Sequence, residues 1–140
     1  MRARVHGHLL AGEVGEIAGV SGTTVGQWAR WGYIRSSQSQ GEPRVYSVED
    51  VGEAAIVGEL LRRGVTHADV RRAIARLAGM GDWPLQAAAL GTTRDGARAR
   101  IVLRERDGGI SLLTARGWQR EAVPPAVEEV HLRLGPAGTL

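Results

Sequence analysis

The feature that most constrains the fold is a pair of short helical patterns joined by a tight turn between residues 10 and 31. In the first pattern, apolar residues recur at the spacing of one helix face: Val14, Ile17 and Ala18. Gly19 is suited to end this helix, because glycine adopts the left-handed conformation without steric cost. Ser21 is suited to cap the next helix, since its hydroxyl can accept the backbone N–H of Thr23 or Thr24. The stretch therefore predicts a helix-turn-helix.

A polar loop and two further helical patterns follow. The loop of residues 33–47 has a Ser-Ser-Gln-Ser-Gln-Gly tip without an apolar residue and ends in an extended Arg-Val-Tyr segment, which predicts a wing. Ser47 is positioned to cap the next helix, with Glu49 and Asp50 in its first turn, where the helix dipole favours acids. Thr66 is positioned to cap a fourth helix. The N-terminal half is therefore expected to hold four helices and a wing.

The order and spacing of these residues resemble the DNA-binding domain of MerR-type transcription regulators, from about Leu9 to Leu77. In that family, a helix ending in alanine leads into a Gly-Val-Ser turn and a recognition helix, and the wing ends in an Arg-x-Tyr-Ser motif. The matching residues are Ala18, Gly19, Val20, Ser21, Thr24, Trp28, Arg30, Gly32, Arg44, Tyr46 and Ser47. The resemblance implies a winged helix-turn-helix of four helices that binds double-stranded DNA.

The chain departs from the family pattern on the recognition helix and after the fourth helix. Gly26 stands where the family usually has an arginine, Gln27 takes a position that is often aromatic, and Ala29 replaces the usual acidic residue. The base sequence that family members bind therefore does not carry over. The family's long dimerisation helix is also missing, because residues 78–84 contain two glycines and a proline, which cannot continue a helix.

The predicted recognition helix, residues 21–31, carries the candidate base contacts. Thr23, Gln27 and Arg30 share one stripe of this helix. A bidentate contact between glutamine and adenine is a common major-groove pairing, which favours base recognition over the alternative of an ordinary polar helix face. Trp28 fits either the helix core or a stacking platform.

The predicted wing carries the candidate phosphate contacts. Arg35 and Arg44 bracket the wing and are placed to reach phosphates beside the helix. Tyr46 is expected to pack on the helix core while its hydroxyl stays in solvent. The full set of candidate DNA-contacting residues is Thr23, Thr24, Gln27, Trp28, Arg30, Arg35, Arg44 and Tyr46. On the fourth helix, three arginines are expected to face solvent, phosphate or a partner: Arg71, Arg72 and Arg76.

The pattern changes from helical to β in the second half. Residues 85–90 predict one or two helical turns, and from Thr92 the apolar period is two. Two apolar runs around an Asp-Gly-Gly turn at residues 107–109 predict a β-hairpin, with Ile101, Leu103, Ile110, Leu112 and Leu113 as their apolar residues. A third run after Pro124-Pro125 predicts a strand or else a helix: Val130, Leu132 and Leu134. A lone hairpin is barely stable, so further packing is expected.

Composition limits the other functions. The net charge of +3 is modest and does not by itself indicate nucleic acid. The chain has no cysteine, and His6 and His8 lack a third ligand nearby, so we expect neither a metal nor a cofactor. Catalysis is not expected, because there is no phosphate loop or nucleophile elbow, and the adjacent Glu128 and Glu129 would point to opposite faces of a strand. Without a long apolar run or a signal peptide, a cytoplasmic protein with no membrane partner is expected.

These observations predict an α+β protein with a four-helix winged helix-turn-helix domain in residues 1–79 and a small antiparallel β module in residues 80–140, for assembly, effector or partner binding. The predicted function is a sequence-specific DNA-binding transcription regulator that contacts the major groove through helix 21–31 and phosphates through the wing 33–47. The alternatives are an antitoxin-like interaction protein that regulates its own operon, and a phage excisionase or architectural factor. The expected partners are double-stranded DNA, a second copy bound through the C-terminal module, and a partner protein.

Overall fold

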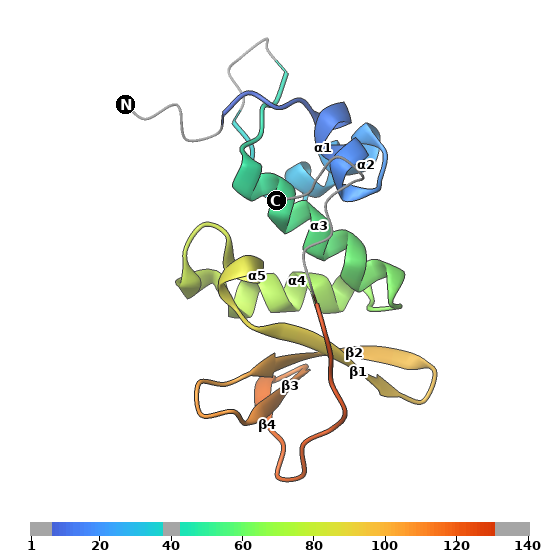
Figure 1. The fold of residues 1–140 in the computed structure, drawn as a ribbon, viewed down its shortest axis with the longest axis vertical. Helices are drawn as coiled ribbons and strands as arrows, with labels where there is room; N and C mark the ends of the chain where they lie inside the picture. The colour runs from blue at the N-terminus through green and yellow to red at the C-terminus, as the bar shows by residue number, and fades with distance from the viewer. Residues whose placement is uncertain (1–6, 38–42, 131–140) are drawn as a thin grey trace. The chain divides into compact units, whose positions relative to one another are not determined.

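The computed structural model describes residues 7–37 and 43–130. In chain order, its elements are α1 (Ala11–Ala18), α2 (Gly22–Arg30), α3 (Val48–Arg62), α4 (His67–Arg76), the 3-10 helix η2 (Ala78–Met80), α5 (Pro84–Ala87), β1 (Leu90–Asp95), β2 (Arg98–Arg104), β3 (Ile110–Thr114), β4 (Gly117–Arg120) and β5 (Glu128–Glu129) (Figure 1). Helices thus precede an antiparallel sheet, which confirms the predicted α+β class.

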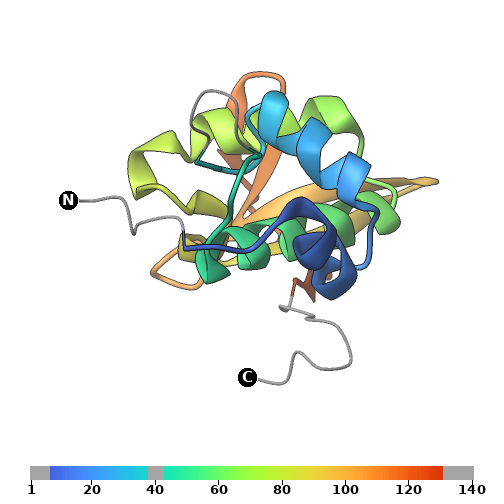
Figure 2. The ribbon, with the colours of Figure 1, turned by 90° about the horizontal axis from the view of Figure 1, so that it is seen from above.

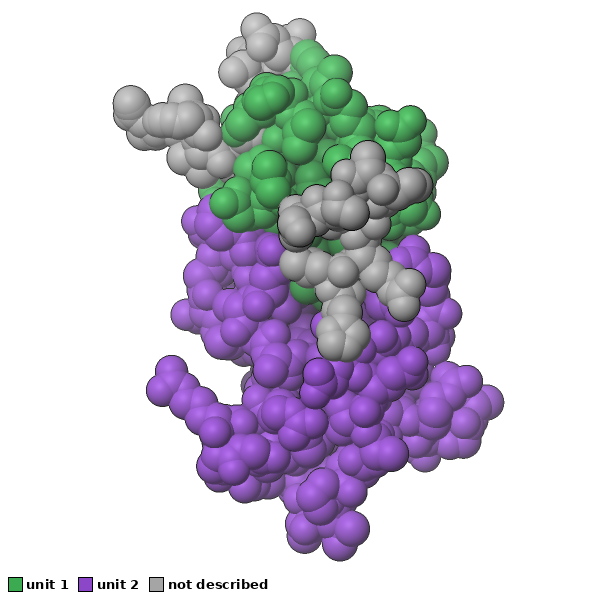
Figure 3. All heavy atoms as spheres, viewed as in Figure 1, with its two compact units in different colours: residues 1–58, 132–140 green, residues 59–131 purple. Residues whose placement is uncertain are grey.

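The chain forms two compact units, shown in different colours in Figure 3. Unit 1 comprises residues 1–58 with 132–140, and unit 2 comprises residues 59–131. The boundary between the units falls within α3 and does not coincide with the domain boundary expected after Gly79. Helix α4 belongs to the same unit as the strands, so a four-helix domain ending at Gly79 stays a prediction.

Unit 1 is built around the helix-turn-helix. Gly19 ends α1 with a left-handed φ of 86°, as the sequence predicted. The hydroxyl oxygen of Ser21 caps α2 by accepting the backbone N–H of Thr24 at 3.0 Å. A Cβ on Gly15 would lie 2.4 Å from the carbonyl oxygen of Val20, so the absence of a side chain at Gly15 lets the turn approach α1 closely. The turn is therefore fixed by local residues.

The wing and the start of α3 complete unit 1. The two sides of the wing are joined by a pair of backbone hydrogen bonds of 2.9 and 2.7 Å between Ser37 and Val45. The predicted wing tip lies outside the described residues. At the start of α3, the Ser47 N–H donates to Oδ2 of Asp50 at 2.9 Å, and the Asp50 N–H donates to the Ser47 hydroxyl oxygen at 3.1 Å. This reciprocal pair forms the cap that the sequence predicted.

Unit 2 combines α4 with a five-stranded antiparallel sheet in the order β4-β3-β2-β1-β5. Figure 2 shows the strands, in yellow and orange, from a second direction. The predicted hairpin is confirmed as β2 and β3, with Val102 opposite Leu112. Strands β1 and β4 extend the hairpin on either side. The predicted third strand corresponds only in part, because β5 ends at Glu129, and Leu132 and Leu134 lie outside the described residues.

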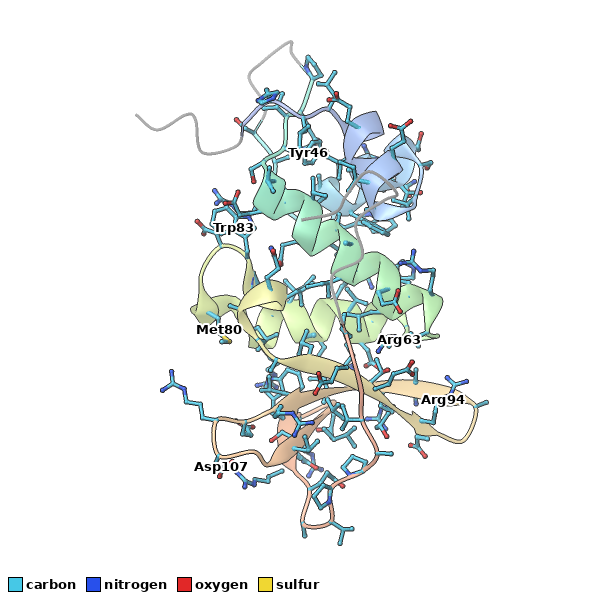
Figure 4. The ribbon with its side chains drawn as sticks, in the orientation of Figure 1. Tyr46, Arg63, Met80, Trp83, Arg94 and Asp107 are labelled. Atoms are coloured by element: carbon cyan, nitrogen blue, oxygen red, sulfur yellow. The ribbon has the colours of Figure 1, made fainter. Side chains whose placement is uncertain are left out.

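The last strand is held by a close backbone approach and by one arginine. A Cβ on Gly91 of β1 would lie 2.6 Å from Cγ1 of Val127 and 2.9 Å from the carbonyl oxygen of Glu128, so glycine lets this segment lie against β1. Arg63 donates from Nη1 to the Glu128 carbonyl and from Nη2 to the Glu129 carbonyl, both at 2.8 Å (Figure 4). Strand β5 is therefore fixed on the edge of β1.

Candidate nucleic-acid interface

One side of helix α2 is buried in unit 1, and the other side exposes a polar stripe to solvent. Val25 and Trp28 are buried, with 0% and 2% exposure. Residues four positions apart share a helix face, so Thr23 and Gln27 lie on one stripe. Thr23 and Arg30 are exposed, and Gln27 is half-buried. The structure thus brings three predicted base-contacting residues to the solvent side of α2.

The guanidinium of Arg30 extends back along α2. A Cβ on Gly26 would lie 3.8 Å from Nη1 of Arg30, which is ordinary van der Waals contact. Gly26 adds no side chain to the helix surface at the position where the MerR type, which the sequence resembles, usually has an arginine. The guanidinium of Arg30 therefore lies beside the position that a side chain at residue 26 would occupy.

The arginines of the wing lie at its base. Arg44 donates from Nη1 to the Ser36 hydroxyl oxygen at 3.1 Å, a side-chain bond across the two sides of the wing. Arg35 precedes Ser36, and both arginines are half-buried. This arrangement limits the conformational freedom of Arg44 before any ligand binds, which lowers the entropic cost of a contact.

Two of the predicted contact residues are core residues. Trp28 is 2% exposed and Tyr46 is 0% exposed. The prediction that the Tyr46 hydroxyl stays in solvent is wrong: the hydroxyl is buried, with no hydrogen-bond partner among the described residues. Tyr46 also pairs with Leu9 in an isolated β-bridge, through backbone bonds of 2.8 and 3.0 Å, which holds this residue in the interior of unit 1. Both rings support α2 and the wing from inside.

The pKa of Tyr46 depends on the charged side chains that lie near the base of the wing. Burial raises the pKa of the Tyr46 phenol, the charges of Arg44 and Arg30 lower it, and the charge of Asp50 raises it, with a net rise. Because both guanidinium groups act on one phenol, the end of α2 and the base of the wing bring positive charge into the same region of unit 1. Such a region favours a polyanion.

Trp31, a residue for which the sequence predicted no DNA contact, lies at the end of the polar stripe. Trp31 is 47% exposed and keeps nearly helical angles, with φ −81° and ψ −5°. Its ring lies 5.6 Å from that of Tyr33 at an interplanar angle of 58°. The spacing of four from Thr23 through Gln27 to Trp31 was a signal in the sequence that would have placed it on this stripe.

Within residues 7–37 and 43–130, no group of three or more His, Asp or Glu side chains is arranged to hold a metal ion. Among the same residues, no helix has the length and apolar character needed to cross a membrane.

Two short helices joined by a Gly-Val-Ser turn, with a wing after the second, define a helix-turn-helix domain. Residues 10–77 match the family described as MerR HTH family regulatory protein. This segment of the chain is therefore a MerR-type helix-turn-helix domain, which confirms the resemblance found in the sequence. The family match supports a DNA-binding regulator in general terms. No curated protein and no solved structure matches the chain.

Proposed function

We propose that the protein is a sequence-specific transcription regulator that places α2 in the major groove of double-stranded DNA and contacts phosphates through its wing. The observation that carries this proposal is the exposed polar stripe on α2 beside the positive charges of Arg30 and Arg44, within a MerR-type domain. The major groove is wide enough to admit a helix, and its base edges differ in their donors and acceptors.

The proposed base contacts come from the middle of α2. Gln27 offers both a donor and an acceptor, so it can form a bidentate contact with adenine. Thr23 lies one turn earlier and supplies a hydroxyl. Arg30, extended over Gly26, is placed to donate to guanine or to a phosphate. This set differs from the usual family pattern, so a different operator sequence is expected.

The proposed phosphate contacts come from the wing. Arg44 and Arg35 lie at the wing base, and the bond from Arg44 to Ser36 holds its side chain near the wing surface. Phosphate contacts set the position of a protein on the duplex without selecting the base sequence. Loss of Arg44 should therefore weaken binding to all DNA sequences to a similar extent.

A second candidate function rests on unit 2. Its sheet has an open outer strand, β4, of a kind that pairs with other chains. This observation favours an interaction protein, antitoxin-like in the sense that its DNA-binding half regulates its own operon while the sheet holds a partner. We also expect that a second copy of the chain binds through the C-terminal module. We propose a cytoplasmic, non-catalytic protein in either case.

The experiment that tests the proposed function is selection of DNA from a random duplex pool by the purified full-length protein. The proposal predicts enrichment of one motif, and loss of that enrichment in the Gln27→Ala, Arg30→Ala double variant. Arg106→Ala, a charge deletion in the β2–β3 turn of unit 2, is the matched control and should return the same motif. Recovery of unenriched sequence by the unaltered protein would contradict the proposal.

A further inference from the structure

The two outer strands of the sheet differ in how they are protected. On β5, the guanidinium of Arg63 occupies the carbonyls of Glu128 and Glu129. On β4, at the opposite side of the sheet, β3 is the sole strand neighbour within the described residues. An outer strand whose backbone is not covered is able to pair with a further strand. Of the two outer strands, β4 is therefore the one available to a partner.

The backbone of β4 alternates between the sheet and the outside. The Glu121 N–H donates to the Ile110 carbonyl at 2.9 Å, and the Gly117 carbonyl accepts the Thr114 hydroxyl at 2.9 Å, so these residues direct their backbone groups toward β3. In an antiparallel ladder, successive residues direct their N–H and C=O groups to opposite sides, so every second residue of β4 faces away from β3. Trp118 and Arg120 therefore present donors and acceptors along the outer side of β4.

Positive charge gathers at the start of this outer strand. A Cβ on Gly117 would lie 3.0 Å from Cζ of Arg76, so the guanidinium of Arg76 from α4 rests against Gly117. Arg116 precedes Gly117 and is exposed. Among the described residues, no carboxylate pairs with Arg76 or Arg116. At the other end of β4, Arg120 is paired with Asp107 at 2.8 Å. The uncompensated charge therefore lies at the Gly117 end.

We propose that β4 binds an acidic, extended segment of another protein, which adds to the sheet as a further strand. The backbone groups of Trp118 and Arg120 would pair with those of the incoming segment, and carboxylates of the segment would meet Arg76 and Arg116. Main-chain pairing gives affinity in this mode of recognition, and side chains give specificity. This inference goes beyond the proposed DNA-binding function and does not rest on it.

A second copy of the chain is a poorer occupant. A parallel pairing of β4 with β4 would bring Arg76 and Arg116 of both copies to the same end of the edge, where like charges oppose association. The described acidic strand β5 is not available to a second copy either, because Arg63 holds both of its carbonyls.

Nucleic acid also fits less well than a peptide. The outer side of β4 alternates N–H donors with carbonyl acceptors, and this alternation matches another strand. A phosphate backbone presents acceptors, so the outward carbonyls of Trp118 and Arg120 would face it without a donor. The combination of an open ladder with two arginines therefore favours an acidic peptide over DNA.

The test is a titration of the full-length, isotope-labelled protein, followed by backbone amide NMR signals. The probe is a nine-residue peptide in which glutamate alternates with valine and threonine. We expect saturable shifts centred on the amides of residues 116–121. The double variant Arg76→Glu, Arg116→Glu should weaken binding at least about fivefold, since each reversal replaces an attraction by a repulsion. Arg106→Glu, the same charge change in the β2–β3 turn, should change it less than about twofold.

Two further arms separate strand addition from charge attraction. The same peptide with N-methyl groups on alternate residues cannot pair along an edge, and it should lose binding while keeping its charge. A peptide with lysine in place of glutamate should not bind. Equal binding of the N-methylated peptide would overturn the proposal, as would shifts of the same amides on adding duplex DNA or on raising the protein concentration alone.

Discussion

The guanidinium of Arg63 donates a 2.8 Å hydrogen bond to the carbonyl oxygen of Glu129, 66 positions further along the chain. The same side chain donates to the hydroxyl of Thr92 on β1 at 3.0 Å and pairs with Glu59 at 2.9 Å. One residue just beyond α3 therefore holds both the first and the last strand of the sheet. We therefore expect the stability of unit 2 to depend on this arginine more than on any local propensity of β5, which is only two residues long.

Arg63→Met should lower the free energy of unfolding by about 2–3 kcal/mol, because it removes several charge-assisted hydrogen bonds and leaves Glu59 without this partner. Arg62→Met is the matched control: the Arg62 side chain is 47% exposed, and its pair with Glu59 should contribute less than about 1 kcal/mol. Urea unfolding of the two variants measures the difference. Equal losses in both variants would contradict the role given to Arg63.

Glu59 gives this cluster a pH dependence. Burial raises the pKa of Glu59, but hydrogen bonds from Arg63 and Arg62 outweigh burial, and the net pKa lies below the usual value of 4.5. A carboxyl whose pKa is lower in the folded state stabilises the fold above pH 4.5, and this contribution is lost as the pH falls through the folded pKa. Glu59→Gln should therefore destabilise the protein at pH 7, and its unfolding curve should approach that of the unaltered protein as the pH falls below 4.5. A difference of constant size across this range would contradict the assignment.

Tyr46→Phe should leave the fold intact and raise its stability by up to about 1 kcal/mol, because it removes a buried hydroxyl without a partner among the described residues. The raised pKa of Tyr46 adds a pH signature, since a phenol that ionises less readily when folded stabilises the fold below pH 10 and loses this contribution as the pH rises further. The unaltered protein should therefore lose stability above pH 10 faster than the variant does. Thermal unfolding between pH 8 and pH 11 measures both effects, and a destabilised phenylalanine variant would show that the hydroxyl has a partner.

Trp31→Ala should weaken DNA binding by about 1 kcal/mol, roughly fivefold, while changing the stability by less than about 1 kcal/mol, because the side chain is half exposed. Trp31 lies at the end of the stripe that carries Thr23 and Gln27, so its ring would contact sugar or a thymine methyl. Val48→Ala, at an apolar position with 67% exposure in the same unit, is the control and should not alter DNA binding. Unchanged affinity in the tryptophan variant would remove Trp31 from the interface.

The helix-turn-helix could be predicted because its signals are local. Ser21 and Thr66 cap the helices that follow them, and the reciprocal bonds of Ser47 and Asp50 join residues three positions apart. Such short-range pairs are visible in sequence spacing. The solvent-facing side of α2 followed from the same helical period.

The sheet could be predicted only where its strands alternate clearly. Strands β2 and β3 do so, whereas β1 has the sequence Leu-Gly-Thr-Thr-Arg-Asp with a single large apolar residue. The hydroxyl oxygen of the buried Thr92 on β1 accepts a hydrogen bond from Arg63, which comes from a distant segment. No local sequence pattern indicates that contact.

The division of the chain into domains at Gly79 stays a prediction, because α4 carries complete helix signals whether or not it packs on a sheet. The structure ties α4 to the strands through the ion pair of Asp69 with Arg98 at 3.5 Å and through Arg76 against Gly117. A fragment ending at Gly79 would lose both contacts. Independent folding of residues 1–79 therefore stays a prediction.

Base selection by α2 and phosphate contact by the wing are separated by comparing Gln27→Ala with Arg44→Ala on the selected motif and on random duplex DNA. Gln27→Ala should cost about 1–3 kcal/mol on the motif and little on random DNA. Arg44→Ala should weaken binding to the motif and to random DNA alike, and it should reduce the slope of log affinity against log salt concentration by about 0.9. Equal losses on motif and random DNA for Gln27→Ala would contradict base recognition by α2.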